Sequence, residues 1–250
     1  MKRIEKLVQN NYIFNEEIRN MQYSSADEKS LEALLVQFQS GNFSQKTKIY
    51  DLMSSNDRDI QKCAAVIGGL VGTNKEIECI FDNVEKWEDT EVQYFIAYSV
   101  YFLASNIGKF LFDMYDEWEE TYVCSAIENS LSYYLGIEMD EEIGEAIQYY
   151  DEIKDSFDIN KYYFNGELID YDFVCYYVLE QARYSFYQKI EIGAFTEISI
   201  LTIVSGLICP VNSHTIIDQE SMVKLGNYLD KIKDMGLSEG EKYFWGHQIQ

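Results

Sequence analysis

Apolar residues recur along most of this chain at intervals of three and four, which places them on one face of an α-helix. Short polar segments separate these stretches, and a single proline, Pro210, with few glycines leaves the stretches uninterrupted. The pattern therefore predicts an all-α fold. We expect helices at residues 1–22, 30–38, 43–53, 57–72, 75–86, 89–106, 108–117, 121–135, 140–150, 171–190, 195–207 and 219–235.

One short motif occurs twice with the spacing of a helical hairpin. The six residues at 87–92 (WEDTEV) and at 118–123 (WEETYV) lie 31 positions apart, and a fainter copy begins at Asp57. Repeats of this length are typical of an α-solenoid, so we expect a HEAT-like stack of helical hairpins. Asp89 and Glu120 would each begin the second helix of a hairpin, where an acid complements the helix dipole. Helix capping explains the motif better than a binding role does.

No linker divides the chain, which indicates a single helical-repeat domain over residues 1–250. Within it we expect N-terminal helices at 1–54, core repeats at 55–136 and a less regular helical part at 137–250. The residues 162–169 (YYFNGELI) predict a tight Asn-Gly turn with short extended arms. The aromatic tail at 243–247 is expected to dock on a neighbouring segment.

Composition argues against export and against most catalytic chemistry. The chain opens on polar residues, and its longest apolar stretch, 198–210, is short and interrupted, so we expect a cytoplasmic protein with no membrane contact. Five scattered cysteines without a Cys-x-x-Cys pair favour reduced core thiols. With only His214 and His247 present, zinc sites and Cys–His or Ser–His nucleophiles lack their partners. We expect no catalytic residue and no cofactor.

Negative charge is concentrated in one segment of the chain. Residues 113–158 carry fifteen acidic side chains and one basic one, Lys154, against a net charge of −23 for the whole protein. Such a field repels nucleic acid and anionic membranes and accelerates association with a basic protein. The alternative is a solvated face that only aids solubility.

The same segment contains the best candidate for a metal site. Asp113, Asp116, Glu117 and Glu120 would share one helix face, an arrangement that can hold magnesium near a phosphate. However, no Lys or Arg lies nearby to bind a diphosphate, and no second acidic motif follows. A magnesium-dependent lyase or transferase is therefore the third interpretation of this chain.

Tyrosine is abundant, with 21 residues, and several of them lie in or beside the acidic segment. Tyr133, Tyr149 and Tyr150 either pack between helices or serve an interface, because phenol rings suit both places. Rings beside carboxylates fit a partner rich in Arg and Lys. The candidate partner-binding residues are Asp113, Asp116, Glu117, Glu120, Tyr133, Asp140, Glu141, Tyr149, Tyr150 and Asp151.

The acidic segment resembles a known family. Residues 115–123 (YDEWEETYV) and 126–131 (AIENSL) are similar to the signature E-x-W-E-D-T-x-V followed by I-R-D-S-L of immunity protein 47, a family of bacterial polymorphic toxin systems. Residues 34–43, 141–145 and 162–167 also resemble family segments, so the likeness covers roughly residues 30–180. The chain departs from the signature at Glu128-Asn129, where the family has Arg-Asp.

The resemblance implies a protein without catalytic residues that binds a cognate toxin domain stoichiometrically and neutralises it. Joined to the charge argument, it suggests an acidic, Tyr-rich surface that faces a basic toxin site. The alternative is an α-solenoid adaptor that binds a peptide or protein unrelated to toxins. The oligomeric state stays open.

Overall fold

The computed structural model of the chain describes residues 25–81, 107–118, 122–137, 143–212 and 214–250. These residues are mostly helical, so the predicted all-α class is confirmed. The first helices are α3 (Ala26–Gln39), α4 (Lys48–Leu52), α5 (Arg58–Val71), α6 (Asn74–Phe81), α8 (Ile107–Trp118), α9 (Tyr122–Leu135) and α10 (Ile143–Ile153). The last three are α11 (Tyr171–Gln188), α12 (Phe195–Ser205) and α13 (Gln219–Lys233).

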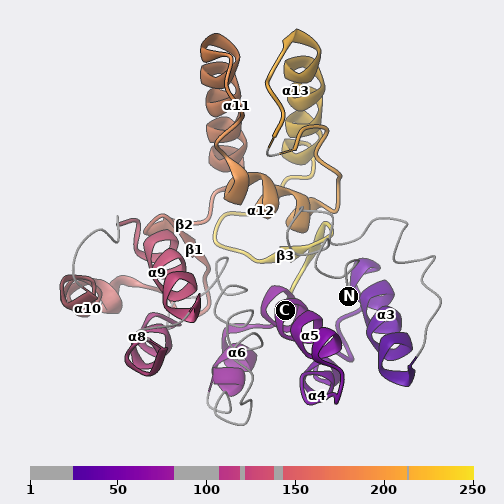
Figure 1. Cartoon of the computed structure of the whole chain (residues 1–250), viewed down its shortest axis with the longest axis vertical. Coiled ribbons are helices and arrows are strands. Elements are labelled where there is room, and N and C mark those ends of the chain that lie inside the picture. Colours follow the sequence, from indigo (N-terminus) through magenta and orange to yellow (C-terminus); the bar gives the residue numbers. More distant parts are fainter. Residues whose placement is uncertain (1–24, 82–106, 119–121, 138–142, 213) are drawn as a thin grey trace.

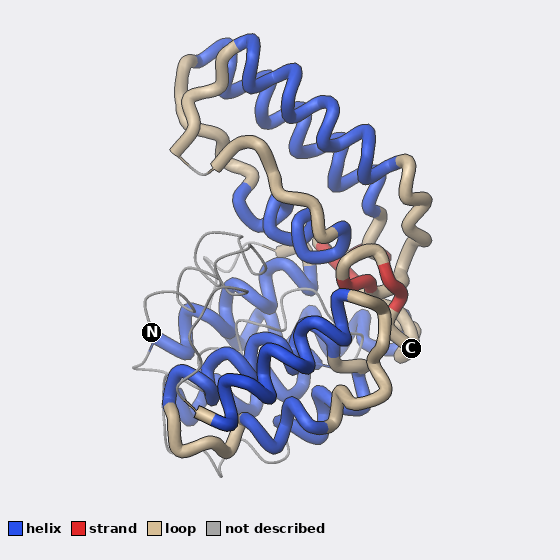
Figure 2. The backbone as a smooth tube through the Cα atoms, turned by 90° about the vertical axis from the view of Figure 1, so that its right-hand side faces the viewer, coloured by secondary structure: helices blue, strands red, loops and turns tan. Residues whose placement is uncertain are grey.

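The helices form two groups that meet at the C-terminal hairpin. In Figure 1, helices α3 to α6 and α8 to α10 lie along an arc, while α11 and α13 stand side by side above it and α12 crosses beneath them. The strand β3 (Tyr243–Phe244) lies between the two groups and contacts both α12 and α5. In Figure 2, α11 and α13 tilt away from the arc, and one long side of this helix pair faces away from the rest of the molecule.

Most predicted helices are confirmed within a few residues, and two differ in extent. α3 begins four residues earlier than expected because Ser25 and Glu28 form a reciprocal capping box around its first turn. The helix expected at 43–53 is reduced to α4. The helices expected at 1–22 and 89–106, and the motif at 87–92, lie outside the described residues. The HEAT-like stacking that rests on them stays a prediction.

Two β-hairpins interrupt the helical pattern. β1 (Tyr163–Phe164) pairs with β2 (Glu167–Leu168), and β3 pairs with β4 (His247–Gln248). The turn residues Asn165 and Gly166 both have positive φ, as the predicted Asn-Gly turn requires. The second hairpin, in the aromatic tail, has Trp245 and Gly246 in the same conformation.

The two hairpins occupy equivalent places at the ends of two helices. The amide of Gly166 donates to the carbonyl of Tyr134 near the end of α9, and the amide of Trp245 donates to that of Ile203 near the end of α12. Both helices then stop at a glycine of positive φ, Gly136 and Gly206. Each hairpin therefore satisfies helix carbonyls that would otherwise have no partner.

A buried lysine links the C-terminal hairpin to the N-terminal helices. The ammonium of Lys242 donates to the carbonyls of Gly69 (2.6 Å) and Gly72 (2.8 Å) at the end of α5, and it lies 5.5 Å from the ring centre of Tyr162. Phe244 is fully buried beside it. The expectation that the aromatic tail docks on a neighbouring segment is confirmed.

Candidate functional site

The acidic segment forms one end of the arc, where α8, α9 and α10 meet. Helical spacing places Glu145, Tyr149 and Glu152 on one face of α10, and all three are exposed. Asp151 is also exposed, and it is paired with Lys154 at 2.7 Å. That hydrogen bond raises the pKa of Lys154, which therefore stays charged. The face as a whole remains strongly negative.

The structure places the predicted binding residues unevenly. Asp113 is exposed on α8. Asp116 and Glu117 belong to the same helix, but their side chains lie outside the description, as do Glu120, Asp140 and Glu141 altogether. The structure therefore brings Asp113, Tyr149 and Asp151 to one end of the molecule, and it leaves the other acids as predictions.

The three tyrosines of the prediction take three different positions. Tyr150 is only 8% exposed and packs its ring 5.4 Å from that of Phe112. Burial raises its pKa, so the phenol stays neutral. Tyr133 is half-buried, stacks on Phe164 and accepts a 2.8 Å hydrogen bond from Thr196. Tyr149 is 39% exposed and is the one of the three whose ring faces solvent.

The described residues also bear on a metal site and on membrane insertion. Among the described residues, no group of three or more His, Cys, Asp and Glu side chains is placed to hold a metal ion. The acids expected to share the face of Asp113 are mostly outside this description. In the same part of the chain, no helix is both long and apolar enough to cross a membrane.

Comparison with known proteins identifies the family. A model of the family described as "Immunity protein 47" matches residues 14–249, almost the whole chain. The chain belongs to the immunity protein 47 family. The predicted resemblance is confirmed, and the match extends well beyond the residues 30–180 that suggested it. No curated protein and no solved structure matches this immunity protein 47 chain.

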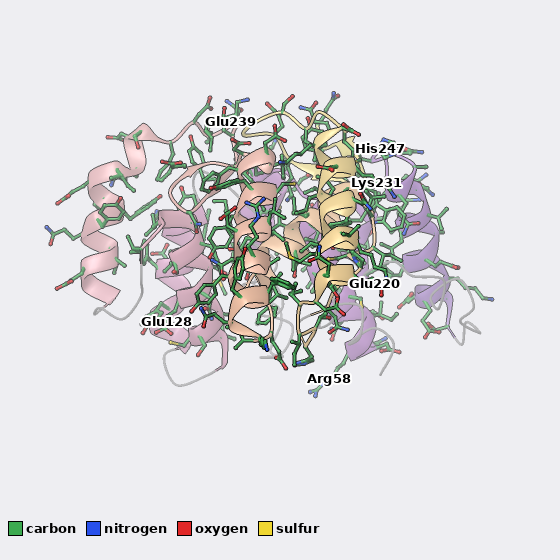
Figure 3. The ribbon with its side chains drawn as sticks, turned by 90° about the horizontal axis from the view of Figure 1, so that it is seen from above. Arg58, Glu128, Glu220, Lys231, Glu239 and His247 are labelled. Atoms are coloured by element: carbon green, nitrogen blue, oxygen red, sulfur yellow. The ribbon has the colours of Figure 1, made fainter. Side chains whose placement is uncertain are left out.

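Charge is distributed unevenly around α11 in this immunity protein 47 chain. Seen from above, Glu128 of α9 lies on the α10 side of α11, whereas Lys231 of α13 and His247 lie on the other side (Figure 3). α13 carries two further exposed lysines, Lys224 and Lys233, against Glu220 and Asp230, and Lys224 is paired with Glu220 at 2.6 Å. The acidic end of the arc and the more basic helix α13 are thus separated by α11.

A set of exposed aromatic rings on α11 was not among the predicted binding residues. Phe173, Tyr176, Tyr177, Tyr184 and Tyr187 are all well exposed, and Tyr187 reaches 78%. The signal was present in the sequence as rings at helical spacing between smaller apolar residues. The sequence did not show which rings are exposed, because both faces of α11 are apolar. Only the packing of the folded chain decides which face is covered.

Proposed function

We propose that this chain binds a cognate bacterial toxin domain one to one and holds it inactive in the cytoplasm of the cell that makes it. The observation that carries the proposal is its membership of the immunity protein 47 family over residues 14–249. The family description names immunity, and binding is the direct way for a chain without a predicted catalytic site to confer it. The partner is a protein, and no cofactor takes part.

The toxin-binding surface is the acidic end of the arc. Its exposed carboxylates lie on α8 and α10, those of α10 on the same helix face as Tyr149, and the expected set continues with Asp116, Glu117, Glu120, Asp140 and Glu141. A surface of this charge attracts a basic site and speeds encounter with it. Arg side chains of the toxin would also stack on exposed phenol rings.

The chemistry favours a toxin that acts on a polyanion. A nuclease needs a basic active site, and a run of carboxylates can occupy that site in place of the phosphate backbone. In this mechanism the immunity protein blocks the substrate path and changes no covalent bond.

A charge-reversal experiment tests the surface. Glu145, Asp151 and Glu152 are replaced together by Lys, and binding to the inactivated toxin domain is measured by calorimetry. We expect this toxin domain to be the C-terminal domain of a secreted protein encoded immediately upstream. We expect the affinity to fall by roughly hundredfold at low salt, because like charges then face each other. The loss should shrink as added salt screens the exposed charges.

The matched control reverses three exposed acids on other elements, Asp51, Asp230 and Glu239, so that the net charge changes equally. We expect this variant to bind within a few-fold of the wild type and to protect cells that express the active toxin. Equal loss in both triple variants would mean that net charge, and no particular surface, drives binding. Unchanged binding by the α10 variant would remove the acidic end from the interface.

A further inference from the structure

The outer face of α11 carries an aromatic stripe of Phe173, Tyr176, Tyr177, Tyr184 and Tyr187. A helix turns about 100° per residue, so these five rings fall within an arc of about 100° and extend roughly 20 Å along the axis. Their exposed fractions run from 38% for Tyr177 to 78% for Tyr187. No other described helix exposes as many large apolar side chains.

The opposite face of α11 already has its partners. Val174, Cys175, Val178 and Ala182 are buried there, where α11 packs on α12 and α13. Burial raises the pKa of the Cys175 thiol, and the α13 residues Lys233 and Asp230 are close enough to influence it. A helix with two apolar faces is expected to be covered on both. One face of α11 is therefore left without a cover in the described part of the chain.

The stripe lies on the side of α11 that is turned away from α13. From side to side, Figures 1 and 3 place α11 between α10 and α13, with α11 above the arc in Figure 1, and the buried face of α11 is turned to α13. Burial raises the pKa of Tyr177, with smaller contributions from Glu197 of α12 and Tyr133 of α9. The end of the stripe at Tyr177 thus lies near α9, and α9 lies between α11 and α10 (Figure 1).

The charge on the stripe itself is small. Between Asp170 and Gln188 the chain carries Asp170, Asp172 and Glu180 against Arg183, and Arg183 is paired with Glu180 one turn away. Two copies of a chain with a net charge of −23 repel each other, which disfavours a homodimer through this face. A partner of positive charge is attracted by the acidic end of the arc and can meet the rings on the same side of the molecule.

The area agrees with a shared interface. Five aromatic side chains that are about half exposed offer roughly 500 Å², since each ring residue can bury about 150–250 Å². A stable heterocomplex buries about 800 Å² on each partner. The stripe is therefore large enough for the centre of an interface, and the acidic end of the arc, which reaches the stripe at α9, would supply the remainder.

We infer that the aromatic stripe of α11 is the apolar centre of the surface that binds a basic protein partner, with the acidic end of the arc as its charged rim. This inference rests on the proposed function, because it takes the toxin domain as the partner. The partner would present aliphatic or Arg side chains beside a cluster of Lys and Arg. Exposed tyrosines at the centre of such a surface commonly dominate the binding energy.

A paired substitution tests the stripe. Tyr184→Ser and Tyr187→Ser are combined, and the control combines Val36→Ser and Val223→Ser, two exposed apolar residues on α3 and α13. Tyr, Val and Ser have similar helix propensities, so both variants should keep the fold, which circular dichroism checks. Binding to the inactivated toxin domain is measured by calorimetry at about 50 mM and about 300 mM salt. Interactions between exposed charges are screened more strongly at the higher concentration.

We expect the double Tyr variant to lose roughly hundredfold in affinity at both salt concentrations, and the control to stay within threefold. If the wild type binds and the double Tyr variant binds equally tightly, the stripe is not part of the interface, while the proposed function still stands. A wild type that does not bind would overturn both. Sedimentation of the chain alone should give a monomer, and a dimer that the Tyr substitutions dissociate would overturn the assignment in favour of a second copy.

Discussion

At the scale of single residues, backbone conformation at the helix ends decides how the hairpins fit. Gly136 ends α9 at a φ of +69°, and a Cβ there would overlap the carbonyl of Asn165 in the first hairpin. The position therefore needs glycine for two reasons, since an L side chain is strained at this φ and has no room. Gly226, inside α13, has neither restriction, because nothing lies within 4 Å of an added Cβ.

This contrast gives a prediction with a matched control. Gly136→Ala should lower the free energy of unfolding by about 2–4 kcal/mol, through backbone strain and displacement of the hairpin. Gly226→Ala should raise it by about 0.5–1 kcal/mol, because alanine favours the helix. Urea unfolding followed by circular dichroism measures both. Equal effects of the two substitutions would show that the hairpin does not press on the end of α9.

Local sequence also determined where several helices begin. Asp170 and Asp218 accept hydrogen bonds from the first amides of α11 and α13, at starts that the helical pattern predicted within one residue. Each cap involves residues that are two or three positions apart, so it can be recognised from the sequence alone. The burial of Tyr150 could not be predicted from the sequence, because its neighbour Phe112 belongs to another helix.

At the scale of elements, the hairpins act as caps for helices that are distant in sequence. Lys242 caps the C-terminal end of α5, and Gly166 caps that of α9. Each donates hydrogen bonds to carbonyls at the end of its helix. Its side chain is only 3% exposed, and burial lowers the pKa of the ammonium well below its usual range. The unfolded chain therefore binds a proton at Lys242 more tightly than the folded chain does.

The linkage has a definite sign. Where the unfolded state binds more protons, the free energy of unfolding rises with pH, here up to the ordinary lysine pKa of about 10.4. Lys242→Met removes this titration, so the stability of the wild type relative to the variant should grow between about pH 7 and pH 9.5. The slope is at most about 1.4 kcal/mol per pH unit. Parallel stability curves for the two proteins, from urea unfolding at each pH, would contradict the lowered pKa.

At the scale of the whole molecule, the last ten residues join segments that the sequence keeps far apart. Lys242 donates to a carbonyl of α5, and the amide of Trp245 donates to a carbonyl of α12. The carbonyl of Gln250 accepts a 2.9 Å hydrogen bond from Lys46. Gly240, which directly precedes these ten residues, accepts a hydrogen bond from the amide of Tyr162 and donates one to the carbonyl of Ile169, the two residues that flank the first hairpin. The C-terminal segment thus connects the arc to the upper helices.

Removing residues 241–250 should loosen both groups of helices together. We expect faster amide hydrogen exchange in α5 and in α12, because each loses the partners of its last carbonyls. Deletion of Gln250 alone leaves those partners in place, and it should change the exchange of neither helix. Faster exchange in α12 with unchanged α5 would mean that Lys242 does not hold the N-terminal helices.

The sequence by itself determined the helical class, most helix boundaries, the Asn-Gly turn, the acidic segment and the family. Each of these depends on neighbours along the chain or on composition, which a sequence displays directly. Only the tertiary structure decided that Tyr150 and Lys242 are buried and that the aromatic face of α11 is exposed. These outcomes depend on contacts between residues many positions apart, and an apolar face carries no local sign of what will cover it.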